Sequence, residues 1–125
     1  MLKRILFIII FLTTIYNLYG ASKEETIDSL LVLAKKYKEI DSIALYDICT
    51  EGINLCNSSK YEIQLGEFNL YLGYFYHNKP SYLKSYESLE TALRIFLKYN
   101  KISLIAETYR FMGESNRATR NLRRQ

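Results

Sequence analysis

The chain has 125 residues, of which 49% are hydrophobic and 24% are charged, and its formal net charge is +4. This apolar content is sufficient for one modest domain with its own core, and it excludes a disordered chain. One proline and five glycines leave long stretches without helix breakers. The abundance of Leu, Ile, Lys, Glu and Tyr therefore indicates helices packed through broad apolar faces.

Residues 1–20 are predicted to be a signal peptide. Lys3 and Arg4 precede an apolar run, which ends at the small residues Gly20 and Ala21. A positive start, an apolar centre and a small-residue cleavage site are typical of secretory signals, and we expect cleavage after Gly20. The mature protein is then periplasmic or secreted.

The alternative is an uncleaved anchor in the inner membrane, formed by residues 5–19. This segment is shorter than the roughly 20 residues that a helix needs to cross the hydrocarbon layer. A helix buried in the domain is a weaker interpretation, because the run is apolar on all sides. We therefore favour the cleaved signal and expect the folded domain to comprise residues 22–125.

Similar helical units are predicted along the rest of the chain. In the first, Ser22 and Glu25 have the spacing of a capping box, and Asp41 or Ser42 can cap the second helix. Two amphipathic helices joined by a short turn lie antiparallel, because each buries its apolar stripe against the other. The units cover about residues 22–58, 59–99 and 101–125.

An internal repeat supports this division. Residues 31–37 and 70–76 share the pattern Leu, any, Leu, small, any, any, Tyr, and residues 110–116 keep only the apolar residue before a small one. A second set of residues is apolar or small in both copies at an offset of 40 positions: Tyr46, Cys49, Gly52, Ile53 and Cys56 match Tyr86, Leu89, Ala92, Leu93 and Phe96. Periodicity of this length indicates a repeat architecture.

The middle unit has the clearest helix signals. Its first helix is predicted over about residues 60–76, with Ser59 and Glu62 at capping-box spacing. A turn containing the only proline follows, and Ser81 can cap a second helix over about residues 82–99. Both helices carry apolar residues at steps of three and four, which gives each one buried stripe.

This unit resembles the tetratricopeptide repeat. The resemblance is carried by Leu72, Gly73, Tyr76, Tyr82, Ser85, Leu89, Ala92 and Leu93. It implies an all-α, α-α superhelical solenoid of antiparallel helix pairs with about two and a half repeats, although a period near 40 exceeds the usual 34. The residues expected to pack the repeats are Ala34, Tyr37, Gly73, Tyr76, Ala92 and Gly113. An ordinary helical bundle without solenoid curvature is the alternative.

The last unit is expected to be incomplete. Its first helix is predicted over about residues 101–116, and the chain stops where a second helix should begin. This helix is either a polar-faced cap or the edge of a truncated reading frame, and we favour the fragment. The final nine residues hold four arginines and no acid, which can contact phosphates or anionic lipid. A solvated helix end is the favoured interpretation, since no aromatics are interleaved.

Catalytic chemistry is poorly supported. His77 is the only histidine and is expected in a surface turn, while Cys49 and Cys56 are expected to be buried thiols about 10 Å apart along one helix. No phosphate loop, metal-ligand spacing or nucleophile elbow is present in the sequence. We therefore expect no enzyme activity, no cofactor and no metal site.

The expected function is binding of a protein or peptide partner. In the tetratricopeptide family, the first helix of each repeat lines a concave groove. Carried over by position, the resemblance implies that the groove residues are Glu67, Leu70, Tyr74, His77, Asn78, Glu107, Arg110, Glu114 and Arg117. This mixture of an aromatic patch with both signs of charge suits an extended peptide.

Two biological roles follow from this expectation. The chain is expected to be an exported scaffold or adaptor, with no nucleic-acid partner and with membrane contact only through an uncleaved N-terminal segment. The alternative is the periplasmic sensing region of a truncated signal-transduction protein of the histidine kinase or transcriptional regulator type.

Overall fold

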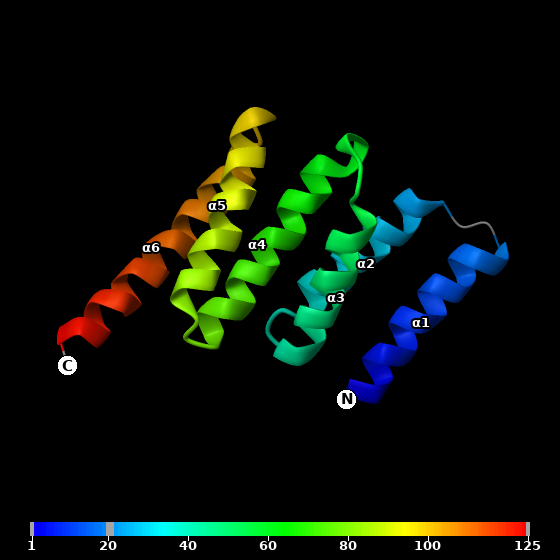
Figure 1. Ribbon diagram of the computed structural model, residues 1–125, viewed down its shortest axis with the longest axis horizontal. Helices are drawn as coiled ribbons and strands as arrows, with labels where there is room; N and C mark the ends of the chain where they lie inside the picture. The colour runs from blue at the N-terminus through cyan, green and yellow to red at the C-terminus, as the bar shows by residue number, and fades with distance from the viewer. Residues whose placement is uncertain (1, 20–21, 125) are drawn as a thin grey trace.

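The computed structural model describes residues 2–19 and 22–124, and within these ranges the chain is all-α, as predicted (Figure 1). No strand occurs in the described residues. The elements are α1 (Leu2–Tyr19), α2 (Lys23–Tyr37), α3 (Ser42–Leu55), the 3-10 helix η1 (Ser59–Tyr61), α4 (Glu62–Asn78), α5 (Tyr82–Lys98) and α6 (Ile102–Arg124).

The helices follow one another as antiparallel pairs (Figure 1). A short turn joins α2 to α3, another joins α4 to α5, and α6 then packs against both α4 and α5. The central element is α4, which contacts α2, α3, α5 and α6. The first helices of the three predicted units, namely α2, α4 and α6, are therefore in contact along the molecule.

The N-terminal segment forms a helix that packs on the first pair. Ile5 is buried, and α1 contacts α2 and α3, whereas the sequence predicted a segment outside the fold. Phe7, Ile10 and Phe11 are exposed on the other side of α1. Within the described residues, none of the helices combines the length and apolar character that a membrane span requires. The predicted cleavage position at Gly20 lies outside the described residues.

The first unit begins both of its helices as predicted. The Ser22 hydroxyl accepts a hydrogen bond of 3.1 Å from the Glu25 amide, which caps α2. The Asp41 carboxylate accepts from the amides of Ile43 and Ala44, each at 3.1 Å, which caps α3. These caps satisfy amides that have no partner inside the helix.

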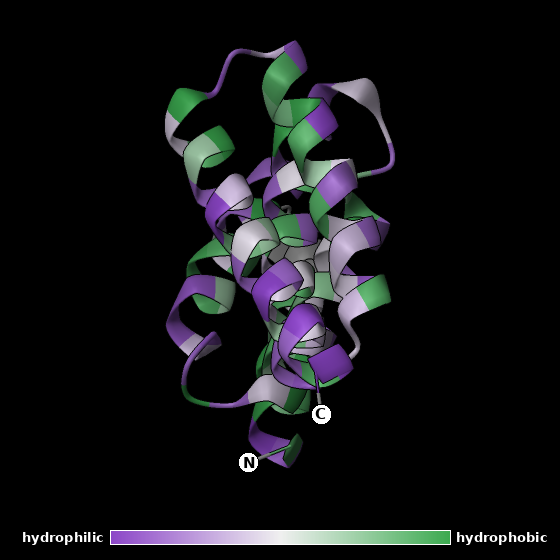
Figure 2. Cartoon of the chain, turned by 90° about the vertical axis from the view of Figure 1, so that its left-hand side faces the viewer, coloured by the Kyte–Doolittle hydropathy of each residue, from purple (hydrophilic) through white to green (hydrophobic). Residues whose placement is uncertain are grey.

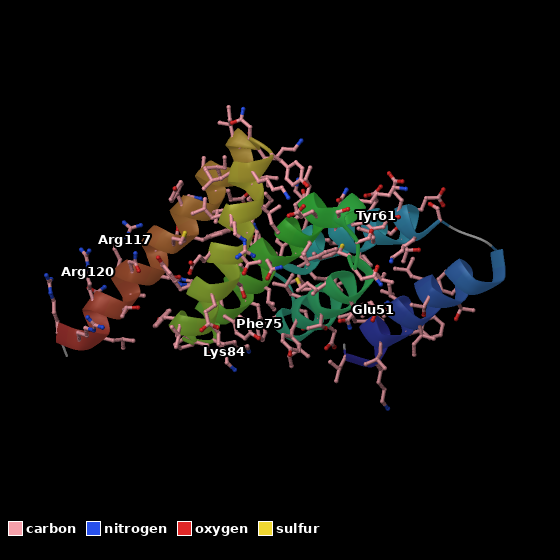
Figure 3. All side chains as sticks on the ribbon, turned by 45° about the horizontal axis from the view of Figure 1, so that its top comes forward. Glu51, Tyr61, Phe75, Lys84, Arg117 and Arg120 are labelled. Atoms are coloured by element: carbon pink, nitrogen blue, oxygen red, sulfur yellow. The ribbon has the colours of Figure 1, made fainter. Side chains whose placement is uncertain are left out.

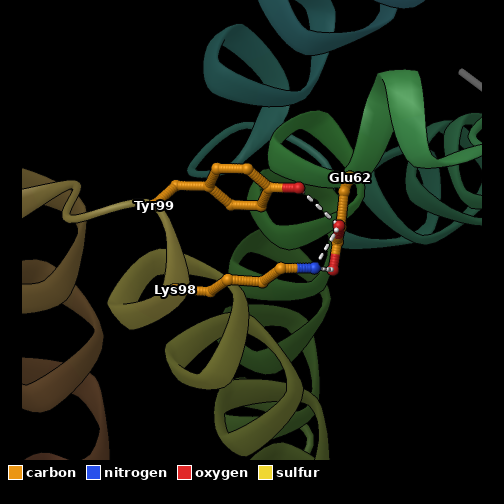
Figure 4. Close-up of polar contacts among 3 residues, drawn as sticks. All are labelled: Glu62, Lys98 and Tyr99. Carbon is orange, nitrogen blue, oxygen red and sulfur yellow. Dashed lines mark hydrogen bonds and ion pairs between the residues drawn. The ribbon is translucent and has the colours of Figure 1, made fainter.

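The two caps predicted in the middle unit are wrong. Ser59 lies in η1, so α4 begins at Glu62 without a side-chain cap, and Ser81 makes no capping bond to α5. Instead, the Glu62 carboxylate accepts from the Tyr99 hydroxyl at 2.6 Å and from the Lys98 ammonium at 3.1 Å (Figure 4). The carboxylate thereby joins the start of α4 to the end of α5.

This bridge also shifts the pKa of each of its members. The hydrogen bond from Tyr99, followed by that from Lys98, lowers the pKa of Glu62. The same carboxylate raises the pKa of Lys98 and of Tyr99. Because all three groups face solvent, salt and water screen the attraction between them.

Small residues allow the helices to approach closely. A Cβ on Gly52 of α3 would overlap the ring of Phe68 from α4, which is fully buried. A Cβ on Gly73 of α4 would lie 2.6 Å from Leu89 of α5. Glycine at these positions leaves the space that the larger neighbour fills, as close packing of a protein interior requires.

The last helix is longer than predicted. It was expected to end near residue 116, but α6 continues to Arg124. Its beginning follows a tight reversal in which Asn100 adopts a left-handed conformation with φ of 53° and the Lys101 amide donates to the Phe96 carbonyl at 2.9 Å. This is the hydrogen bond that closes a Schellman motif, and it ends α5 sharply.

Candidate binding groove

A groove of about 450 Å³ lies across the three first helices. Each of α2, α4 and α6 contributes to its wall, so residues from all three predicted units meet there. The lining residues are Leu31, Val32 and Lys35 from α2, Lys38 directly after it, Glu67 and Tyr71 from α4, and Leu104 and Glu107 from α6.

The groove has one basic wall and two acidic positions. Lys35 lies in the last turn of α2 and Lys38 directly follows that helix, whereas Glu67 and Glu107 come from α4 and α6. The ammonium of Lys38 also lies 5.2 Å from the centre of the Tyr74 ring, within the range of a cation–π interaction. A ligand in this groove therefore meets opposite charges on its two sides.

Burial raises the pKa of two groove residues. It raises the pKa of the Glu67 carboxyl, and the charge of Asp28 adds to this effect while Lys101 opposes it. Burial, followed by the nearby carboxylates Glu107 and Glu67, raises the pKa of Tyr71 to about 12. Tyr71 therefore stays a neutral hydrogen-bond donor at neutral pH.

Glu67 and Glu107 are the only two of the predicted partner-binding residues that line the groove. Leu70 has 1% of its surface exposed and belongs to the core between α4, α5 and α6, so it cannot touch a partner. Tyr74 is half-buried, with its ring 5.4 Å from that of Phe111 in an edge-to-face arrangement. Both side chains thus pack α4 against α6, and only that of Leu70 is fully covered.

The two predicted residues at the end of α4 behave differently from each other. His77 lies in the last helical turn and not in a surface turn, and its Nδ1 is 3.0 Å from the Ser115 hydroxyl of α6. Its ring also lies 5.6 Å from that of Tyr82. Asn78 is exposed and ends the helix. His77 thus joins α4 to α6, which the sequence reasoning missed because Ser115 is distant in the chain.

The charged residues of α6 pair along their own helix. The Arg110 guanidinium lies 4.0 Å from the Glu107 carboxylate and 3.4 Å from that of Glu114. Arg117 is exposed further along α6. These ion pairs occupy the surface of α6, and pairs of this kind contribute little to stability.

Five of the six predicted repeat-packing residues lie at helix contacts. Ala34 and Ala92 are fully buried, Gly73 faces Leu89, and Tyr37 and Tyr76 are half-buried. Gly113 differs, because a Cβ there would meet nothing within 4 Å. Among the described residues, no helix covers this side of α6, so Gly113 makes no packing contact.

Both cysteines are free and buried, as predicted. Burial raises the pKa of Cys49 far above its usual range, and burial also raises that of Cys56, to about 11. Each sulfur therefore stays a protonated thiol at neutral pH, which makes it a poor nucleophile. In the described part of the chain, no three His, Cys, Asp or Glu side chains are grouped so that they can hold a metal ion.

The groove residues of α2 were missed by sequence reasoning, although a signal for them existed. In the family pattern, the ligand-facing residues are the second, fifth, ninth, twelfth and thirteenth, with the small residue as the eighth, and the first unit contains these positions too. Counted from Ala34 as the small eighth position, these positions are Asp28, Leu31, Lys35, Lys38 and Glu39. Leu31, Lys35 and Lys38 line the groove, whereas Asp28 and Glu39 do not.

Comparison with known proteins gives no independent guide to the ligand of this groove. The chain matched no family model, no curated protein and no solved structure.

Proposed function

We propose that the chain is a non-catalytic, exported scaffold that binds an extended peptide segment of a partner protein in the groove across α2, α4 and α6. The observation that carries this proposal is the groove itself, which is open and lined by apolar, aromatic and oppositely charged side chains. Such a surface is complementary to a peptide of mixed sequence.

The charges define the ligand more closely. Lys35 and Lys38 are suited to carboxylates on one side of the peptide, and Glu67 and Glu107 to Lys or Arg on the other. Leu31 can pack against an apolar side chain between them. We therefore expect a peptide in which acidic and basic residues flank an apolar position.

A solenoid of the tetratricopeptide kind is part of the proposal. Support comes from the repeat, because several residues of α3 are buried together with the residues of α5 that lie 40 positions later. Cys49 and Leu89 form one such pair, and Gly52 and Ala92 form another. The succession of two helix pairs with a third first helix fits the same scheme. In such repeats, the first helices form the ligand-facing side.

The proposal can be tested by photocrosslinking in the cell envelope. A photoreactive benzoylphenylalanine is placed at Val32, which lines the groove, or at Leu97, which is exposed on α5. We expect the same partner band from Val32 in repeated preparations and no such band from Leu97. Charge reversal by Lys35→Glu should remove this band, because it reverses the basic wall.

Two results would contradict the proposal. One is equal crosslinking from Val32 and Leu97, which would indicate contact without a preferred face. The other is a Val32 band that persists unchanged with Lys35→Glu in a folded protein, as judged by circular dichroism. Recovery of the chain only from the cytosol would overturn the export part alone.

A further inference from the structure

A second surface lies at the end of the molecule where α5 begins and α6 ends. Residues 79–86 and 115–124 contain six cations and no acidic residue, although Glu87 and Glu114 border them. We call these two segments the basic end. Its exposed cations are Lys79, Lys84, Arg117, Arg120, Arg123 and Arg124. None of the ion pairs found within the described residues includes any of them.

The fold brings the two segments together. The α4–α5 turn and the C-terminal end of α6 lie at the same end of the molecule (Figure 1). A pocket of about 280 Å³ separates them and is lined by Tyr82, Leu83 and Tyr86 of α5 and by Ser115, Thr119 and Arg123 of α6. The contacts of His77 with Ser115 and Tyr82 lie beside it and hold the three helices together.

Several cations of the basic end can be located directly in the structure. Lys84 lies beside the α4–α5 turn, and Arg117 and Arg120 project from the C-terminal half of α6 (Figure 3). Viewed from the α6 side, the last turns of that helix are strongly hydrophilic (Figure 2). The three labelled cations therefore lie at the end of the molecule where α5 begins and α6 ends.

An exposed leucine stands among these cations. Leu83 has 74% of its surface exposed, the highest value among the large hydrophobic side chains whose burial the structure describes. It is flanked in sequence by Tyr82 and Lys84, and Tyr86 lies one helical turn away. Apolar side chains, tyrosines and cations at one surface are the composition that proteins use at the boundary between lipid and water.

We propose that the basic end docks on the surface of an anionic lipid bilayer. Leu83 enters the boundary below the headgroups, Tyr82 and Tyr86 lie at headgroup level, and the cations contact lipid phosphates. This contact is separate from the peptide groove and does not require α1 as an anchor. Lipid is favoured over nucleic acid because an exposed leucine adds nothing to phosphate or base contacts.

The test measures sedimentation of the full chain with vesicles of phosphatidylcholine alone or mixed equally with phosphatidylglycerol. The variant Lys84→Glu, Arg120→Glu, Arg123→Glu is compared with Lys60→Glu, Arg94→Glu, Lys101→Glu, which changes as many exposed cations outside the basic end. Neutral vesicles report the contribution of α1, which is the same in both variants.

We expect the first variant to lose at least about 100-fold in partitioning onto anionic vesicles, since each cation at such a surface contributes about 1 kcal/mol. Partitioning of the control variant should fall less than about tenfold, because its changed charges lie beyond the reach of the lipid surface. Leu83→Ser should lower partitioning onto anionic vesicles about tenfold. Ile102→Ser, at a site that is 71% exposed, should leave this partitioning unchanged.

Equal losses for the two charge sets would overturn the proposal. So would equal binding of the unaltered chain to neutral and anionic vesicles. Binding to duplex DNA in preference to vesicles, with no effect of Leu83→Ser, would assign the basic end to nucleic acid instead. Leu83→Ser changes one exposed side chain, so its result does not depend on a folding defect.

Discussion

Most buried positions of α3 are also buried in α5, but the two cores differ in chemistry. At an offset of 40 residues, Leu45 and Ile48 of α3 correspond to Ser85 and Ser88 of α5, and all four side chains are buried. The core around α3 is therefore mostly apolar, whereas the one shared by α5 and α6 contains several hydroxyls. These corresponding positions are thus alike in burial and different in side-chain chemistry.

The hydroxyls of the second core form a connected network. Ser85 donates a hydrogen bond of 2.7 Å to the Gly73 carbonyl and lies 3.5 Å from the Ser115 hydroxyl, which in turn contacts His77. These bonds link α4, α5 and α6. Buried polar groups that are fully satisfied make packing specific, so this core depends on directional bonds where the first depends on shape.

The largest effect is expected at a glycine of the first core. Gly52→Ala should lower the free energy of unfolding by about 2 kcal/mol, because the added methyl overlaps the buried Phe68 ring. The matched control, Gly113→Ala, should raise it by about 0.5–1 kcal/mol, since a helix gains from Ala where space is open. Urea unfolding measures both, and equal signs would contradict the packing described for Gly52.

A smaller effect is expected in the second core. Ser85→Ala should lower the free energy of unfolding by about 1 kcal/mol, because it removes the hydrogen bond to the Gly73 carbonyl. Ser103→Ala, at an exposed position near the start of α6, should change it by less than about 0.5 kcal/mol. If Ser85→Ala were as stable as the unaltered chain, the hydroxyl network would not distinguish the two cores.

The smallest effect is a pair of opposite pH dependences. The folded-state pKa of Glu62 is lowered, so its bridge stabilises the protein above the ordinary value of 4.5 and is lost as pH falls through the folded value. The folded-state pKa of Glu67 is raised, so its destabilising effect at neutral pH disappears as the pH falls below that raised value towards 4.5.

Urea unfolding at neutral and acidic pH separates these contributions. Glu62→Gln should be less stable than the unaltered chain at neutral pH. In acid, the free energies of unfolding of the two proteins should become similar. Glu67→Gln should be more stable at neutral pH and lose that advantage in acid. The same sign for both variants would show that the environments assigned to the two carboxyls are wrong.

Sequence patterns predicted the helices better than the contacts between them. The periodicity and the Asp41 cap are local features, so the elements followed from them. The capping role of Glu62 was wrong because Lys98 and Tyr99, distant in the chain, compete for the same carboxylate. Leu70 was assigned to a ligand surface because its position in a family pattern does not reveal that α6 covers it.

The residues that line the groove across α2, α4 and α6 agree only in part with those that the sequence selected. Glu67 and Glu107 were identified, whereas Tyr71 lies one residue from a selected position and was missed. A shift of one residue rotates a side chain by about 100° around a helix, so small differences in packing decide which neighbour faces the groove. Such rotations depend on tertiary contacts and are not determined by spacing alone.

The central position of α4 has a consequence for how the domain opens. Leu65 and Tyr74 pack against both cores, so neither pair of helices can separate without exposing apolar surface of α4. Repeat proteins with many units can unfold from one end, but here the shared helix couples the units. Amide protons of α4 should therefore exchange with solvent most slowly and only through cooperative opening of the whole domain.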